Sequence, residues 1–152
     1  MKKYHRPLLA LALALATLIL AGPSGRAAQP DSAGTLTVQV QGIRDTRGKL
    51  VVNLFRPGDS LFGKPHLRVV AAAHAGAAEV SLPDLPYGEY VAFAFHDLND
   101  NGVLDHNWLH FPAEPLGYSN HWNFGLLTGL PTFEKTQFHF TPQTSEITIR
   151  LK

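Results

Sequence analysis

The sequence predicts an all-β fold, a single antiparallel β-sandwich of the immunoglobulin-like or transthyretin-like kind with about seven strands. Three observations predict it. First, apolar and polar residues alternate with a period of two in several short segments, as in strands that bury one face. Second, clusters of Gly, Pro, Asn and Asp separate these segments and mark turns. Third, the sequence shows no long amphipathic helix and no internal repeat.

The residues that precede any strand have the pattern of a signal peptide. Lys2, Lys3 and Arg6 come before an apolar run over residues 8–20, which is too short to span a bilayer comfortably. Small residues follow, so we expect cleavage after Ala27. The predicted organisation is a signal peptide over residues 1–27, a flexible leader over 28–34 and a β-sandwich domain over 35–152. The protein is therefore expected to be exported, periplasmic or secreted, with no integral membrane segment after cleavage.

The composition of the predicted mature chain limits its partners and its means of stabilisation. Nine basic and twelve acidic residues remain without the signal peptide, a net charge of −3. No cluster of Lys or Arg is left that would indicate nucleic acid as a partner. Cysteine is absent, so the exported domain must be stable without disulfides. Roughly 125 residues suffice for one hydrophobic core but not for two.

The strands are predicted from alternation and from the turns between them. Leu36, Val38 and Val40 alternate with polar residues, and a turn over residues 45–48 leads into the next strand as a hairpin. The strongest strand is the fifth, with bulky apolar residues on one face and small alanines on the other. The predicted strands are, in order, residues 35–41, 49–55, 67–73, 77–82, 90–96, 136–140 and 146–151.

A long insertion over residues 97–135 separates the fifth strand from the last two, and it opens with a loop of the calcium-binding type. Oxygen-bearing side chains stand at its first, third, fifth and ninth positions, and Gly102 at the sixth allows a sharp bend. Trp108 occupies the twelfth position, where an EF-hand has a carboxylate, so we predict a Ca²⁺ loop on a β scaffold. The predicted ligands are Asp97, Asn99, Asn101, the Val103 carbonyl, Asp105 and Glu114. The alternative is an empty turn in which Asn and Asp side chains bond to their own backbone.

Histidines in and beside the insertion give a second hypothesis. His96, His106, His110 and His121 lie close in sequence, and imidazole nitrogen favours zinc, copper, iron or nickel over calcium. These residues are possible alternative metal ligands of a small His-dependent metalloenzyme or transition-metal-binding protein. Their spacing matches no HExxH pair, and hydrogen-bonded loop histidines are the competing interpretation.

Aromatic residues also gather in the insertion. Trp108, Tyr118 and Trp122 are candidates for a ligand surface, because exposed rings can stack on sugars or contact a partner's apolar surface. Buried, the same rings would form a satellite core that fastens the insertion to the sheet. The sequence leaves both possibilities open.

Five short motifs in fixed order resemble those of a known family. They are Gly88-Glu89-Tyr90, the loop from His96 to Asp105, Pro112-x-Glu114, Gly117-Tyr118-Ser119-Asn120 and Pro131-x-Phe133-Glu134. Together they are similar to the bacterial family called domain of unknown function 2141, over residues 36–151. The resemblance implies an exported β-sandwich domain without an established activity. His110 and Pro115 stand where the family often has glycine.

These observations combine into one expected function. We expect an exported, non-enzymatic binding or structural module of the cell envelope, whose insertion is ordered by one calcium ion. Its partner would be a glycan, a peptide or an envelope protein. The alternative from another class is the His-dependent metalloenzyme or transition-metal-binding protein.

Overall fold

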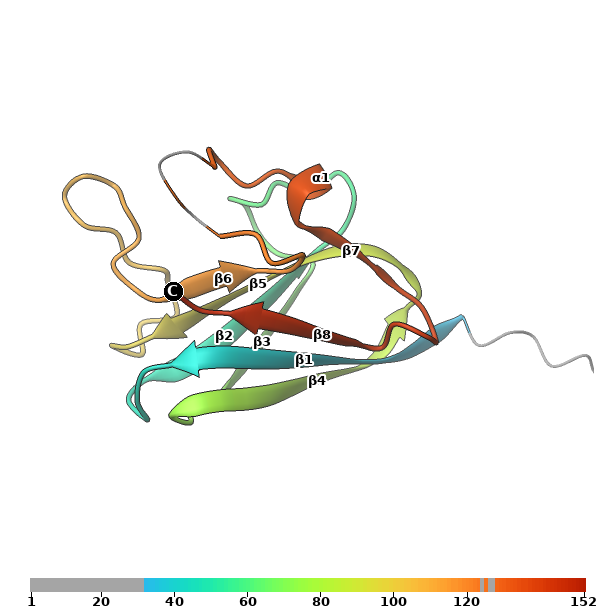
Figure 1. The fold of residues 1–152 in the computed structure, drawn as a ribbon, viewed down its shortest axis with the longest axis horizontal. Helices are drawn as coiled ribbons and strands as arrows, with labels where there is room; N and C mark the ends of the chain where they lie inside the picture. The colour runs from blue at the N-terminus through green and yellow to red at the C-terminus, as the bar shows by residue number, and fades with distance from the viewer. Residues whose placement is uncertain (1–31, 124, 126–127) are drawn as a thin grey trace, which may run out of the picture.

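The computed structural model describes residues 32–123, 125 and 128–152, which form two packed β-sheets (Figure 1). The elements are β1 (Ala33–Ile43), β2 (Lys49–Phe55), β3 (Leu67–Ala72), β4 (Gly76–Pro86), β5 (Gly88–Asp97), β6 (Leu116–Tyr118), α1 (Phe133–Thr136), β7 (Gln137–Phe140) and β8 (Glu146–Arg150). The predicted all-β class and sandwich architecture are confirmed. The predicted signal peptide lies outside the described residues, and β1 begins inside the predicted leader, at Ala33.

One of the two sheets is mixed and the other is antiparallel. One has the order β4-β1-β8, and the other has the order β3-β2-β5-β6 with β7 also paired to β5. All pairs are antiparallel except β1 with β8, which is parallel. The chain crosses from β7 in the second sheet to β8 in the first, so β8 is not bound to the hairpin geometry that makes neighbouring strands antiparallel. The β1–β8 pair is therefore the one exception to the antiparallel pairing that the sequence predicts for this sandwich.

The main core lies between the sheets and follows the predicted alternation. Leu36, Val38 and Val40 of β1 are fully buried there. The facing strand β5 contributes Ala92 and Ala94, whose small side chains let the sheets approach closely. Burial of alternate residues on facing strands is what fixes the register of a half-buried strand.

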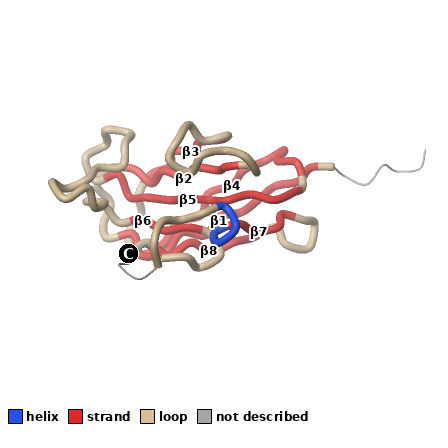
Figure 2. Tube along the Cα trace, turned by 90° about the horizontal axis from the view of Figure 1, so that it is seen from above, coloured by secondary structure: helices blue, strands red, loops and turns tan. Residues whose placement is uncertain are grey.

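A second apolar cluster lies on the other, outer face of the β3-β2-β5-β6 sheet. Its buried members are Val51, Phe55, Val91, Phe93, Phe95, Leu116 and Tyr118. Since β2 and β5 are buried on both faces, the outer face must be covered by something other than a sheet. Figure 2 shows the cover: α1 and the long loops lie over the strands.

The insertion contains two elements that the sequence did not predict, β6 and α1. β6 has only three residues and pairs with the middle of β5. Its central Gly117 lies so close to the Arg150 carbonyl that a Cβ atom would collide with it. The Leu116 amide donates to the Lys152 carbonyl (3.2 Å), and the Lys152 amide donates to the Leu116 carbonyl (3.0 Å). β6 thereby joins the insertion to the C-terminal end of the other sheet.

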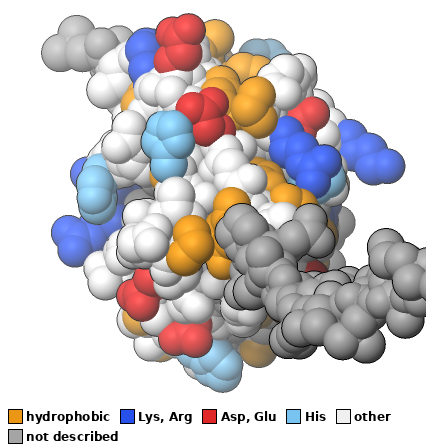
Figure 3. All heavy atoms as spheres, turned by 90° about the vertical axis from the view of Figure 1, so that its right-hand side faces the viewer, with side chains coloured by type: hydrophobic (Ala, Val, Ile, Leu, Met, Phe, Trp, Pro, Cys, Tyr) orange, Lys and Arg blue, Asp and Glu red, His pale blue; other side chains and the backbone are white. Residues whose placement is uncertain are grey.

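Two surface features bear on possible partners. Among the described residues, no helix has the length and apolar character needed to cross a membrane. On the end of the molecule drawn in Figure 3, acidic, basic and histidine side chains are interspersed, so this end presents no surface of a single charge.

Candidate functional site

The calcium-type loop begins at Asp97, a buried residue at the end of β5. The Asp97 carboxylate accepts hydrogen bonds from the backbone amides of Asn101 (3.1 Å) and Gly102 (2.7 Å). Asp100 and Gly102 have positive φ angles of 59° and 76°, which bend the chain back toward Asp97. The first predicted ligand is therefore fixed in place by the loop itself.

Three other predicted ligands come together across the loop. The Asp105 carboxylate accepts hydrogen bonds from the side-chain amides of Asn99 (2.7 Å) and Asn101 (3.1 and 3.2 Å). The amide oxygens accept backbone N–H groups instead, Asn99 Oδ1 from Asn101 (3.2 Å) and Asn101 Oδ1 from Val103 (2.8 Å). A carbonyl oxygen has two lone pairs, so each retains one for another partner.

Glu114 lies at the base of this loop and bridges its two ends. One carboxylate oxygen accepts the Leu98 amide (2.8 Å) and the other accepts the Asp105 amide (3.2 Å). Glu114 is itself buried. The sequence placed Glu114 at the loop as a ligand, and the hydrogen bonds give it a further role in holding the loop closed.

The donor chemistry of the loop suits calcium better than a transition metal. Every predicted ligand offers oxygen, as Ca²⁺ requires. Within the described residues, no three His, Asp or Glu side chains lie together as a metal site. A cation here would therefore depend on the amide oxygens of Asn99 and Asn101 and on the Val103 carbonyl as well as on carboxylates.

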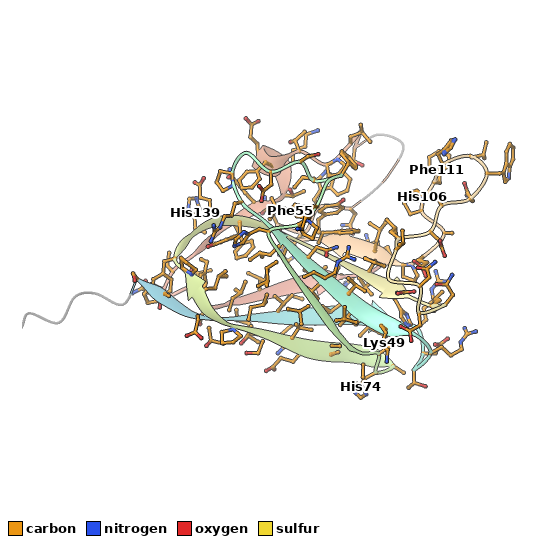
Figure 4. The ribbon with its side chains drawn as sticks, turned by 180° about the vertical axis from the view of Figure 1, so that it is seen from behind. Lys49, Phe55, His74, His106, Phe111 and His139 are labelled. Carbon is orange, nitrogen blue, oxygen red and sulfur yellow. The ribbon has the colours of Figure 1, made fainter. Side chains whose placement is uncertain are left out.

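The segment after the loop, residues 105–113, forms a projecting hairpin that we call the finger. Its strands are joined by the bond from the Ala113 amide to the Asp105 carbonyl (2.8 Å), and Asn107 Oδ1 caps its tip by accepting the Leu109 (3.0 Å) and Phe111 (3.1 Å) amides. Figure 4 shows the finger projecting from the sheets. Trp108, at its tip, is 86% exposed.

The other two aromatic candidates are packed inward. Tyr118 stacks on Phe93 with ring centroids 4.6 Å apart, and Trp122 meets Tyr118 edge-on at 5.2 Å. Burial raises the pKa of the Tyr118 phenol to about 12. The predicted ligand surface is thus divided: Trp108 is on the finger, while Tyr118 and Trp122 belong to the outer cluster.

The four histidines lie in different surroundings. His96 is fully buried beneath the β1–β2 turn. Its Nε2 lies 2.8 Å from the Arg47 carbonyl, and its Nδ1 has no hydrogen-bond partner among the described residues. His106 and His110 are on the finger, and His121 is exposed after β6. The structure does not gather them into one metal site within the described part of the chain.

A cleft of about 600 Å³ lies over the outer cluster. Its floor is formed by phenylalanines of β2 and β5, and its walls by the β2–β3 loop, the calcium-type loop, the finger and residues 130–131. Figure 4 shows Phe55 at the end of β2, with His106 and Phe111 on the finger. The lining residues are Asn53, Phe55, Leu61, Phe62, Gly63, Arg68, Phe93, Phe95, Gly102, Val103, Leu104, His106, His110, Phe111, Pro112, Leu116, Tyr118, Leu130 and Pro131.

Two polar residues in the cleft link its floor to the calcium-type loop. Asn53 and Arg68 face each other across β2 and β3, and Arg68 Nε donates to Asn53 Oδ1 (2.8 Å). Arg68 Nη1 donates to the Gly102 carbonyl (3.0 Å). Neither residue is predicted from the sequence, because their pairing depends on the register of two strands rather than on a motif.

The comparison with family models agrees with the motif order in the sequence. The model described as "Uncharacterized protein conserved in bacteria (DUF2141)" matches residues 38–148. The chain belongs to this family. Neither the search of curated proteins nor the search of solved structures gives a match. DUF2141 membership brings no activity with it, so function must be inferred from the site.

One DUF2141 motif, residues 117–120, includes a serine that could be mistaken for a nucleophile. Ser119 is fully buried, and its hydroxyl accepts the Ala92 amide (2.9 Å) while donating to the Thr136 carbonyl (2.5 Å). Both hydrogen-bonding functions of the hydroxyl are therefore used to tie the insertion to β5 and α1. Ser119 acts as a structural tether in this fold.

Proposed function

We propose that this protein is an exported, non-enzymatic binding module of the cell envelope in which a calcium loop forms one wall of the binding cleft. The observation that carries the proposal is the shared position of Gly102, Val103 and Leu104. These residues belong to the calcium-type loop and also line the cleft. An ion that orders the loop would therefore fix the shape of the cleft.

The predicted ligands support the calcium part of the proposal. Asp97, Asn99, Asn101 and Asp105, with the Val103 carbonyl and Glu114, would hold the ion through oxygen. Bound Ca²⁺ would neutralise the carboxylates of this ligand set. A site with so few charges is expected to have a Kd on the order of 10⁻⁴–10⁻³ M, as in extracellular modules.

The export part of the proposal is supported by the composition of residues 1–27. Calcium is useful to a weak site mainly outside the cytoplasm, where its concentration reaches the millimolar range of such sites. The expected partners are a glycan, a peptide or an envelope protein, which the cleft and the finger would contact together. Trp108 at the exposed tip supports such a contact, because aromatic residues are enriched in binding interfaces.

Thermal unfolding of the purified protein tests the calcium site. Against excess EDTA, we expect 10 mM Ca²⁺ to stabilise the fold by about 1–3 kcal/mol and raise Tm by several degrees. Asp105→Asn should abolish this shift. Asp100→Asn is the matched control, because it removes one charge from an exposed loop position outside the predicted ligand set, and its response to calcium should be retained.

The same experiment with micromolar Zn²⁺ separates the proposal from the histidine alternative. A shift with zinc alone would favour a transition-metal-binding protein that uses His96, His106, His110 or His121. A protein whose Tm ignores both metals would contradict the calcium loop.

A further inference from the structure

We infer that the cleft binds a small amphipathic oxyanion, with its apolar body against the phenylalanines and its oxyanion at Arg68 and Asn53. This inference rests on the proposed binding role of the cleft and names the chemistry of its ligand. It depends on the cleft's size, on its aromatic lining and on the Arg68 guanidinium in its wall, which has no acidic partner within the described residues.

The size and the lining define the apolar part of the ligand. A volume of about 600 Å³ lies within the range of roughly 300–1,000 Å³ that is usual for small-molecule sites. Phe55, Phe93 and Phe95 line the floor of the cleft, where Phe93 and Phe95 stack with ring centroids 5.7 Å apart, and Phe62 and Phe111 stand at the rim. Aromatic faces bind rings and hydrocarbon chains well. A ligand with a ring system or a short acyl chain fits this space.

Arg68 defines the charge of the ligand. Its Nε and Nη1 groups bond to the Asn53 side chain and the Gly102 carbonyl, both of which are neutral. The ion pairs found within the described residues are Arg47 with Asp45 and His139 with Glu89, so Arg68 has no acidic partner there. The described lining of the cleft also includes no Asp or Glu. A guanidinium beside an apolar surface favours an oxyanion such as a carboxylate.

Asn53 supplies the second donor. The residue is only 3% exposed, and its Oδ1 is used by Arg68. The hydrogen bond from Arg68 uses the amide oxygen alone, and Asn53 lines the cleft, so its Nδ2 group is the donor that a ligand would meet there. An amide NH₂ group carries two N–H donors, each of which can bond to an acceptor. The oxyanion that pairs with Arg68 can supply it.

Two fluorescent probes of similar shape test the inference. 1-Anilinonaphthalene-8-sulfonate carries an oxyanion, and N-phenyl-1-naphthylamine has the same arylamine body without a charge. We expect Arg68→Gln to weaken sulfonate binding by roughly 10-fold or more, the loss of a charge-assisted hydrogen bond. Binding of the uncharged probe should change less than about 2-fold. Arg44→Gln is the matched control, because Arg44 is exposed and is not part of the cleft lining.

A second pair of variants places the probes in the cleft. Phe62 is 70% exposed at the rim, so Phe62→Ser should leave the fold intact while weakening both probes. Val70→Thr changes another exposed apolar side chain, 53% exposed on β3 and outside the cleft lining, and should leave both probes bound. Circular dichroism checks that each variant is folded.

The outcomes separate the inference from the proposed function. If both probes bind, respond to Phe62→Ser and ignore Arg68→Gln, the oxyanion inference is overturned while the binding role of the cleft stands. If neither probe responds to Phe62→Ser, the cleft is not a binding site and both are overturned. Selective loss of the sulfonate in Arg68→Gln supports both.

Discussion

The two faces of the β3-β2-β5-β6 sheet are buried in different ways. On the inner face, Leu50 and Leu54 of β2 pack against the strands of the other sheet. On the outer face, Val51 and Phe55 of the same strand are covered by loops and by the insertion. Both faces are apolar, and the outer face carries the cleft of about 600 Å³.

This difference shows how the molecule can combine a rigid frame with a binding site. A sheet packed on a sheet is held by regular register over many residues, which leaves little freedom for change. A cover of loops depends on a few specific hydrogen bonds, such as the one that Arg68 donates to Gly102 and the two that Glu114 accepts. Sites built from loops on a rigid platform are the common arrangement for binding.

The largest expected effect on stability comes from a comparison of two leucines, one from the inner face of the sheet and one from the outer. Leu50 is fully buried in the inner core, so Leu50→Ala should lower the free energy of unfolding by about 2–5 kcal/mol. Leu61 is half-buried beside the outer cluster, and Leu61→Ala should cost at most about 1 kcal/mol. Urea denaturation measures both. Equal losses would mean that the loop cover is packed as tightly as the inner core.

The inner face was accessible from sequence, because alternation is a local signal. Leu36, Val38 and Val40 were predicted to share a face, and all three are fully buried. The outer cluster also has a counterpart in the sequence: residues 50–55 form an almost continuous apolar run, interrupted only by Asn53. Such a run is typical of a strand that is buried on both faces.

The sequence predicts the residues of the calcium-type loop but not the cleft beside it. The oxygen positions from Asp97 to Asp105 are encoded in one short segment, and Glu114 was placed at the same loop. The cleft depends on segments far apart in the chain, and the contact between Arg68 and Gly102 spans 34 positions. No local pattern reveals that contact, since it follows from the pairing of β3 with β2 and from the path of the insertion.

A second prediction concerns pH and the outer cluster alone. The folded state raises the pKa of Tyr118 to about 12, whereas the unfolded chain releases this proton near the ordinary value of about 10. The neutral phenol therefore adds its full contribution to the free energy of unfolding below about pH 10. This contribution is lost as pH rises toward 12, and the loss amounts to roughly 2–3 kcal/mol.

Tyr118→Phe supplies the comparison, because it keeps the ring beside Phe93 and removes the phenol. The difference in free energy of unfolding between the two proteins should change between about pH 9 and pH 12 by the amount expected above. A constant difference across this range would show that Tyr118 is not shielded by the cover.

The smallest expected effect comes from a substitution in the loops that cover the outer face, which leaves the strands beneath them unchanged. Glu114→Gln removes the carboxylate that accepts the Leu98 and Asp105 amides, and should cost about 1–3 kcal/mol even in EDTA. Glu134→Gln, at an exposed carboxylate in α1, is the control and should leave stability almost unchanged.

Hydrogen exchange of the Glu114→Gln protein shows which part of the fold is loosened. Faster exchange should be confined to residues 98–113, with β2 and β5 as protected as before, because the loop opens locally while the sheets stay packed. Acceleration spread over both sheets would mean that the cover and the platform unfold as one unit, and the contrast between the two faces would not hold.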